Sequence, residues 1–204
     1  MPPAASSCSS ASGSDMEARA LDIPGCYLFS LPRFPDARGE FRKLLHAPTL
    51  TALGLEADYA ESYVSVSHRG VLRGLHFQAP PSDHAKLVTC LSGRARDGLL
   101  DLRRGSPTFK QSLSLILDGD EPQAVYVPRG VAHGFAAHRD QTALLYYTTS
   151  VHDPLRDAGV DPRSAGIDWW AGESGMKEPI MSPRDAGLPA LDDFITPFTY
   201  AGAP

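Results

Sequence analysis

The chain has 204 residues, 42% of them hydrophobic and 21% charged, which is enough to bury one substantial core, and we expect a single folded domain. The formal net charge of -5 argues against a nucleic-acid-binding protein, although local arginines could still hold one phosphorylated small molecule. The sequence lacks a long apolar run and a basic start followed by an apolar centre, so we predict no membrane span and no secretory signal, and expect a cytoplasmic protein.

The predicted elements begin after an N-terminal segment, residues 1–20, whose Ser, Ala, Gly and Pro content is typical of disorder. The folded part is predicted over residues 21–204, with a short helix over 48–55. From residue 63 onward, short runs of Val, Leu, Tyr and Thr are broken by turn signals roughly every ten to fifteen residues, which predicts an antiparallel sandwich or barrel. Residues 153–168 are predicted to be irregular. The C-terminal segment is predicted to form a short helix or a wrap over the barrel.

His76 and Lys86 lie on two neighbouring strand-like segments. An imidazole is a base near neutral pH, and an ammonium group stabilises a developing negative charge, so the pair suits proton transfer next to a carbonyl. Each residue also has a plainer interpretation, since most strand histidines are structural and most strand lysines are solvated.

Two adjacent tyrosines in the segment 144–149 are candidates for returning a proton. Because side chains alternate along a strand, Tyr146 and Tyr147 point to opposite faces, and at most one easily enters the barrel. Alternation does not choose between them, and both could simply be packing residues.

Arg38 and Arg73 are candidates for binding a diphosphate, because a guanidinium group meets phosphate oxygens in pairs. Regular alternation would place Arg73 and His76 on opposite faces of one strand. Gly74 could carry a bulge that changes this, or Arg73 could serve a neighbouring subunit's site.

Seven segments together resemble the dTDP-4-dehydrorhamnose 3,5-epimerase family. They are residues 34–41 (FPDARGEF), 69–78 (RGVLRGLHFQ), 101–109 (DLRRGSPTF), 127–135 (VPRGVAHGF), 144–149 (LLYYTT), 166–169 (GIDW) and 182–191 (SPRDAGLPAL). The resemblance runs over residues 23–191 in the family's order. It implies an all-β, cupin-type jelly roll or barrel with short peripheral helices, a homodimer, and a site inside the barrel mouth that needs no cofactor.

The resemblance also implies individual roles. His76 would remove a carbon-bound proton with Asp185 orienting its imidazole, Lys86 would stabilise the enolate, and Tyr146 would return a proton to the other face. For Asp185 the alternative is a turn or N-cap residue, and His133 could instead be a structural histidine paired with a buried acid such as Asp97. The implied substrate-binding set is Arg38, Lys43, Glu61, Tyr63, Arg73, His133, His152, Asp157 and Arg184.

The chain departs from the family pattern at several of these positions. Lys43 replaces a glutamate, Glu61 and Tyr63 replace a Gln-x-Asn pair, His152 replaces a tyrosine and Asp157 replaces a glutamate. We therefore expect dTDP-4-keto-6-deoxyglucose to be used less well than a related substrate with another base, or another sugar near C2 and C3. Alternatively, Lys43 and Glu61 form an ion pair and Tyr63 stacks on the thymine, which leaves the preference unchanged.

The predicted function is epimerisation of a nucleotide-linked 4-keto-6-deoxyhexose at C3, C5 or both, in deoxysugar biosynthesis. One alternative is the same proton chemistry on another nucleotide sugar or ketone. A second is a metal-dependent cupin, for which the histidines would be His76, His84, His133 and His138, although His76-Phe-Gln78 lacks the usual His-x-His pair. A third is a non-catalytic sugar-binding cupin.

Overall fold

The computed structural model describes residues 16–175 and 178–202. The elements are, in chain order, β1 (Glu17–Ala20), β2 (Tyr27–Ser30), β3 (Arg33–Asp36), β4 (Gly39–Arg42), α1 (Ala47–Ala52), β5 (Glu61–Ser67), β6 (Leu72–Gln78), β7 (Lys86–Ser92), β8 (Arg94–Asp101), β9 (Ser112–Asp118), β10 (Gln123–Val127), β11 (Val131–Ala137), β12 (Thr142–Thr148), β13 (Asp157–Gly159), the 3-10 helix η1 (Pro162–Ser164) and α2 (Pro183–Ala186). Strands therefore dominate the described part of the chain.

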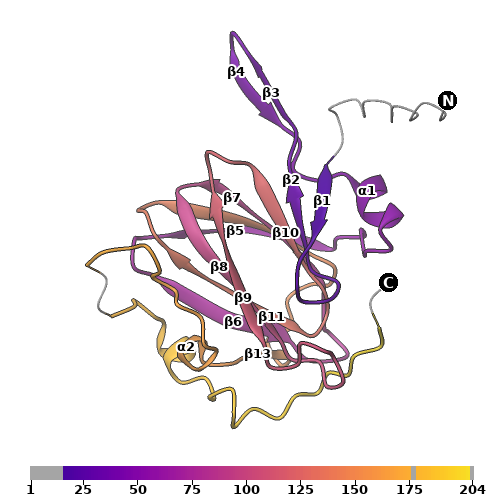
Figure 1. Cartoon of the computed structure of the whole chain (residues 1–204), viewed down its shortest axis with the longest axis vertical. Coiled ribbons are helices and arrows are strands. Elements are labelled where there is room, and N and C mark those ends of the chain that lie inside the picture. The colour runs from indigo at the N-terminus through magenta and orange to yellow at the C-terminus, as the bar shows by residue number, and fades with distance from the viewer. Residues whose placement is uncertain (1–15, 176–177, 203–204) are drawn as a thin grey trace, which may run out of the picture.

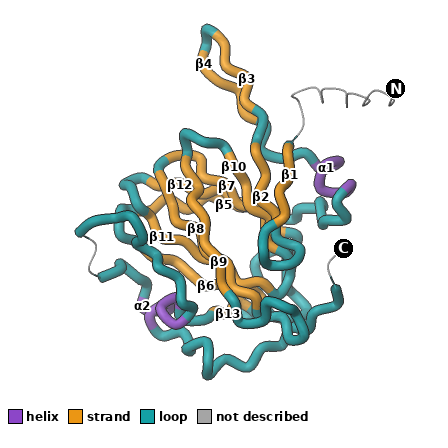
Figure 2. Tube along the Cα trace, viewed as in Figure 1, coloured by secondary structure: helices purple, strands orange, loops and turns teal. Residues whose placement is uncertain are grey.

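Two antiparallel sheets face each other, and a separate hairpin projects from one end (Figures 1 and 2). One sheet has six strands in the order β1-β2-β10-β7-β12-β5, and the other has five in the order β13-β6-β11-β8-β9. Strands β3 and β4 form the projecting hairpin. The facing sheets and short peripheral helices confirm the predicted all-β jelly roll.

Side-chain alternation divides the apolar residues into three buried clusters. Val88, Phe135 and Leu144 belong to the cluster between the sheets. Their neighbours along the strands turn outward, so that Leu87 packs with α1 residues over the six-stranded sheet and Ala136 packs with C-terminal residues over the five-stranded sheet. Burying each large apolar side chain contributes roughly 1.5–3 kcal/mol, so the clusters hold both sheets in place from both sides.

Along three strands, the inward-facing residues are apolar in one part and polar in the other. On β7, Lys86 precedes the buried Val88 and Cys90; on β12, the buried Leu144 precedes Tyr146 and Thr148. On β11, His133 precedes Phe135 and Ala137. The apolar part of each strand fills the space between the sheets, which leaves the polar part to line an opening at one end.

The structure corrects two predicted boundaries. Glu17–Ala20 form β1 within the segment predicted to be disordered, and β13 (Asp157–Gly159) lies within the segment predicted to be irregular. Both are short strands without an apolar alternation, made by pairing with β2 and β6, so the local sequence does not reveal them. The prediction for residues 1–15 lies outside the described residues.

The helix predicted over 48–55 is present as α1 (Ala47–Ala52), and the C-terminal segment, predicted to be a short helix or a wrap, contains the short helix α2 (Pro183–Ala186). Within the described residues, no helix combines the length and the apolar character needed to cross a bilayer.

Candidate active site

A cavity of about 420 Å³ opens between the two sheets, a size typical of small-molecule sites. The structure brings most of the predicted site residues to it from strands and loops far apart in the sequence. The predicted residues that line it are Glu61, Tyr63, Arg73, His76, Lys86, His133, Tyr146, His152, Asp157 and Arg184.

Asp185 lies behind His76, as the family pattern implies. The imidazole Nε2 of His76 on β6 lies 2.8 Å from Oδ1 of Asp185, which is buried on the short helix α2. The Gly74 N–H donates to Oδ2 of Asp185 at 3.3 Å, and the Ser182 hydroxyl caps α2 by accepting from the Asp185 N–H at 3.0 Å. Burial favours the neutral acid, but the hydrogen bonds from His76 and Gly74 hold the Asp185 pKa below its ordinary value. An ionised Asp185 accepts from Nε2–H, which leaves Nδ1 of His76 free to accept a proton.

A bulge in β6 brings Arg73 and His76 to the same cavity. His133 of β11 pairs with His76, whereas Phe135, two residues on, pairs with Arg73, so β6 contains one extra residue between them. Gly74 adopts a φ of +122°, and a Cβ there would lie 2.5 Å from the Gly134 Cα, so only glycine fits. The bulge predicted at Gly74 is confirmed.

Arg73 lines the cavity with little to satisfy its charge. Its Nε donates to the Ser67 hydroxyl at 3.1 Å, and no carboxylate in the described part of the chain lies within ion-pair distance. The guanidinium group is therefore suited to an anionic ligand.

Lys86 begins β7 and is buried, and its ammonium group donates to the His76 carbonyl at 3.1 Å. Burial lowers the Lys86 pKa to about 8, an effect that Asp157 and Asp97 partly oppose. Lys86 is therefore a cation at neutral pH that loses its proton a little above it, beside the backbone of the candidate base.

Tyr146 on β12 enters the cavity, and Tyr147 does not. Tyr146 is buried, and burial, followed by the charge of Asp97, raises its pKa well above the ordinary value. The phenol therefore keeps its proton over the whole neutral range and can donate it. Tyr147 turns to the outer face of the sheet and packs on Tyr59, with ring centroids 5.7 Å apart.

His133 fits both interpretations given for it from the sequence, because it pairs with a buried acid and also lines the cavity. Its Nε2 lies 2.7 Å from Oδ2 of the fully buried Asp97, and its ring also lines the cavity. The His133 and Tyr146 rings contact each other in a T-shaped arrangement, at a centroid distance of 5.7 Å and an interplanar angle of 76°. Asp97 therefore fixes the ring in an orientation that supports Tyr146.

The candidate base and the candidate acid come from opposite sheets. His76 belongs to the five-stranded sheet with Arg73 and His133, whereas Tyr146 and Lys86 belong to the six-stranded sheet. A ring that lies between the two sheets and parallel to them would have His76 on one face and Tyr146 on the other.

The charged groups at the cavity rim are largely paired within the chain. The Glu61 carboxylate accepts from the His152 backbone N–H at 2.7 Å, and Arg184 forms an ion pair with Asp157 at 2.9 Å. The first contact ties β5 to the loop that carries His152, and the second ties α2 to β13.

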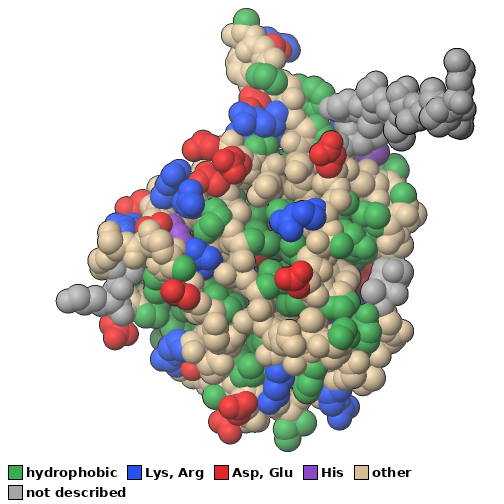
Figure 3. Space-filling view, in the orientation of Figure 1, with side chains coloured by type: hydrophobic (Ala, Val, Ile, Leu, Met, Phe, Trp, Pro, Cys, Tyr) green, Lys and Arg blue, Asp and Glu red, His purple; other side chains and the backbone are tan. Residues whose placement is uncertain are grey.

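Arg38 and Lys43 are not brought to the cavity of their own chain. Arg38 sits at the turn of the β3–β4 hairpin with its side chain 90% exposed, and it pairs with Asp36 of the same hairpin at 2.5 Å. Lys43 follows β4, and its backbone N–H donates to the Pro32 carbonyl at 3.2 Å. The hairpin stands away from the body of the molecule and carries both charged and hydrophobic side chains (Figure 3).

Three polar residues that line the cavity were missed from the sequence, namely Ser65, Gln78 and Thr148, and His84, considered only as a metal ligand, also lines it. Each of the three missed residues stands two positions from a predicted residue on the same strand, namely Tyr63, His76 and Tyr146. Because side chains alternate along a strand, this spacing places them on the same face, and it is the signal that could have found them.

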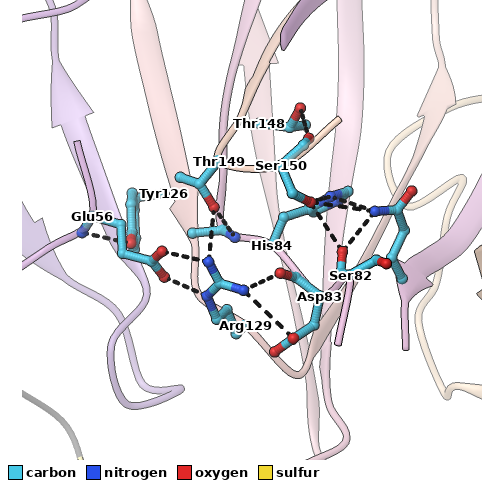
Figure 4. A network of polar contacts seen from close by, with 11 residues as sticks. Glu56, Ser82, Asp83, His84, Tyr126, Arg129, Thr148, Thr149 and Ser150 are labelled. Atoms are coloured by element: carbon cyan, nitrogen blue, oxygen red, sulfur yellow. Dashed lines mark hydrogen bonds and ion pairs between the residues drawn. The ribbon is translucent and has the colours of Figure 1, made fainter. Parts of the chain in front are cut away.

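The loop that carries His84 is fixed by a polar network (Figure 4). The Ser150 hydroxyl and the Gln78 amide both donate to the Ser82 carbonyl, at 3.0 and 2.7 Å, and Nδ1 of His84 lies 3.2 Å from both side chains. Arg129 joins Glu56 to Asp83 on the far side of the loop. Burial, followed by the charge of Lys86, lowers the His84 pKa to about 3, so its ring is neutral at physiological pH.

Of the four histidines considered as metal ligands, His76, His84 and His133 line the cavity, whereas His138 lies elsewhere. His138 is buried against the C-terminal segment, where its Nε2 donates to the Trp169 carbonyl at 2.8 Å. In residues 16–175 and 178–202, no group of three or more His, Cys, Asp or Glu side chains is placed to hold a metal ion.

Comparison with known proteins matches residues 20–193 to the family model described as dTDP-4-dehydrorhamnose 3,5-epimerase. The dTDP-4-dehydrorhamnose 3,5-epimerase of Mycobacterium tuberculosis is 38% identical over 182 residues, covering 87% of this chain and 89% of that protein. The dTDP-4-dehydrorhamnose 3-epimerase of Streptomyces niveus is 38% identical over 173 residues, covering 83% and 81%. Among solved structures, the dTDP-6-deoxy-D-glucose-3,5-epimerase of Legionella pneumophila in complex with dTDP-4-keto-L-rhamnose superposes with a TM-score of 0.82 at 29% identity, covering 89% of this chain and 95% of that one.

Proposed function

The chain belongs to the dTDP-4-dehydrorhamnose 3,5-epimerase family, and we propose that it is an isomerase that inverts C3, C5 or both of a nucleotide-linked 4-keto-6-deoxyhexose in deoxysugar biosynthesis. One observation carries the mechanism: a base and a proton donor line one cavity from opposite sheets. Inversion at carbon needs this arrangement, because the proton leaves from one face and returns to the other.

The first step is proton abstraction. The ketone at C4 acidifies the protons on C3 and C5, and Nδ1 of His76 takes one of them while Asp185 stabilises the resulting imidazolium. The electron pair of the broken C–H bond moves to the C4 oxygen as an enolate. The buried ammonium group of Lys86 stabilises that negative charge, which exists only partway through the reaction.

The second step returns a proton to the opposite face. The enolate electrons form a new C–H bond with the phenolic proton of Tyr146, and solvent later restores that proton while His76 releases the one it took. His133, held by Asp97, supports the Tyr146 ring throughout. The steps balance without any redox change, so the proposal involves no cofactor.

Arg73 is proposed to bind the diphosphate, because it lines the cavity with no carboxylate partner in the described part of the chain. Glu61, Tyr63, His152, Asp157 and Arg184 line the rim around the sugar and the nucleotide. Glu61 presents a carboxylate where the family usually has an amide, and this carboxylate accepts a hydrogen bond from the His152 backbone N–H. The predicted shift in nucleotide preference follows from this difference in hydrogen-bonding capacity and is tested below.

Arg38 and Lys43 enter the proposal only through a homodimer, in which the hairpin of one subunit serves its partner's cavity. Two features support association. Phe34 and Phe41 on the hairpin are 39% and 65% exposed, and Val64 and Val66 on the edge strand β5 are 50% and 53% exposed.

Sedimentation analysis should give a dimer. Mixing inactive Arg38→Ala and His76→Ala proteins should restore activity, because one site of each mixed dimer would be intact; a monomer would contradict this part.

The function is tested by incubating the protein in deuterated water with dTDP-4-keto-6-deoxyglucose and following C3 and C5 by NMR. Each inverted carbon should carry deuterium, and the pattern states whether the chain acts at C3 alone or at both positions. Running the uridine, cytidine and guanosine diphosphate forms in parallel ranks the nucleotides. If no form gains deuterium at C3 or C5, the proposed function is wrong.

A further inference from the structure

Tyr63 covers the ring of Tyr146. The two residues are direct cross-strand partners on β5 and β12, and their rings are stacked with centroids 4.8 Å apart and an interplanar angle of 15°. Tyr63 is 42% exposed and Tyr146 only 6%, so Tyr63 forms the solvent side of the stack. Alternation along β5 puts Glu61, Tyr63 and Ser65 together on the face that lines the cavity.

The Tyr146 ring is therefore held from two directions. Tyr63 stacks on the Tyr146 ring, and His133 contacts the Tyr146 ring in a T-shaped arrangement at an interplanar angle of 76°. His133 is fixed in turn by Asp97. Aromatic pairs in such offset-stacked geometries shift an equilibrium by roughly 2- to 12-fold beyond the effect of the area they bury, so removing one partner should release the ring measurably.

We propose that Tyr63 is a positioning residue that holds the Tyr146 phenol on the inverting face and so sets the ratio of inversion to simple proton exchange. This inference rests on the proposed function. An enolate has two outcomes: His76 can return a solvent-derived proton to the original face, which exchanges the hydrogen without inversion, or Tyr146 can protonate the opposite face. A Tyr146 ring that moves away loses only the second outcome.

The test compares Tyr63→Ala and Tyr63→Leu, which remove the stacked ring, with Tyr63→Phe, which keeps it. In deuterated water, early time points give the amount of deuterated sugar with the original configuration relative to inverted sugar. Tyr63→Ala and Tyr63→Leu should raise this ratio by about 2- to 12-fold. Tyr63→Phe should give the same ratio as the unmodified protein, whatever its effect on KM, because the ring and not its hydroxyl makes the contact with Tyr146.

A matched control is Tyr59→Ala, which removes a ring from Tyr147, the neighbour of Tyr146 on the outer face of the same strand. It should leave the ratio unchanged even if it lowers the melting temperature. A purely structural role for Tyr63 would lower both outcomes together. An unchanged ratio in both ring-removing variants, or an equal change in Tyr63→Phe, overturns the inference while the proposed function stands. If the unmodified protein incorporates no deuterium, the proposed function fails first and the inference fails with it.

Discussion

Replacing Asp185 by asparagine tests the dyad without changing the shape of the site. Asp185 is 3% exposed, so solvent does little to screen the interaction of its carboxylate with His76 at 2.8 Å. A hydrogen bond to a charged group contributes about 1.5–3 kcal/mol, and the imidazolium that benefits exists only after proton abstraction. The loss therefore falls on the barrier, and kcat should drop by about 10- to 150-fold. The assay is the initial rate of deuterium incorporation into the 4-keto sugar, with kcat measured in parallel.

The control for this substitution is Asp161→Asn. Asp161 does not line the cavity and forms an ion pair with Arg163 at a distance of 2.8 Å, so the substitution should leave kcat unchanged. The stronger check is non-additivity. In a His76→Ala protein, adding Asp185→Asn should cost little more, because the carboxylate then has no imidazole to act through. If Asp185→Asn lowers kcat by the same factor whether or not His76 is present, the His76–Asp185 dyad is not the base. The same conclusion follows if Asp185→Asn leaves kcat unchanged when His76 is present.

Four further predictions follow from the same site. His76→Ala should lower turnover by roughly 10²- to 10⁴-fold while circular dichroism stays unchanged, and normal activity in the folded variant would exclude the proposed base. Tyr146→Phe should retain deuterium exchange but lose inversion by NMR, whereas Tyr147→Phe should do little; the reverse result would mean that the strand register is misassigned. In a pH profile, kcat should fall above about pH 8 as Lys86 loses its proton, and Lys86→Arg should move that fall to higher pH; an unmoved limb would assign it to another group. Arg73→Ala should raise KM for the nucleotide sugar at least several-fold with a smaller change in kcat, since a diphosphate contact acts before and during the reaction alike; an unchanged KM would remove Arg73 from the binding set.

Strand alternation and family order account for most of what could be predicted. Alternation required Tyr146 and Tyr147 to face opposite sides, and the family order chose the one that enters the cavity. The bulge at Gly74 was predictable because two cavity residues three positions apart need an extra residue between them. Applied along β5, β6 and β12 from each predicted residue, the same rule would also have found Ser65, Gln78 and Thr148.

Other features depend on contacts that spacing does not encode. His76 and Asp185 are 109 positions apart, and only the return of the C-terminal segment across β6 brings them together. The stacking of Tyr63 on Tyr146 depends on the β5–β12 register, which a single sequence does not specify. Arg38 lies on a hairpin whose strands β3 and β4 are almost entirely exposed and whose Phe34 and Phe41 rings contact each other.

The measurement that tests the central claim most directly is an experimental structure of the protein with a bound dTDP-linked 6-deoxyhexose. The account predicts that the sugar ring lies between the two sheets, with the inverted carbon about 3–3.5 Å from Nδ1 of His76 on one face and the Tyr146 hydroxyl at a similar distance from the other. A sugar bound with both groups on the same side of the ring, or bound outside this cavity, would contradict it.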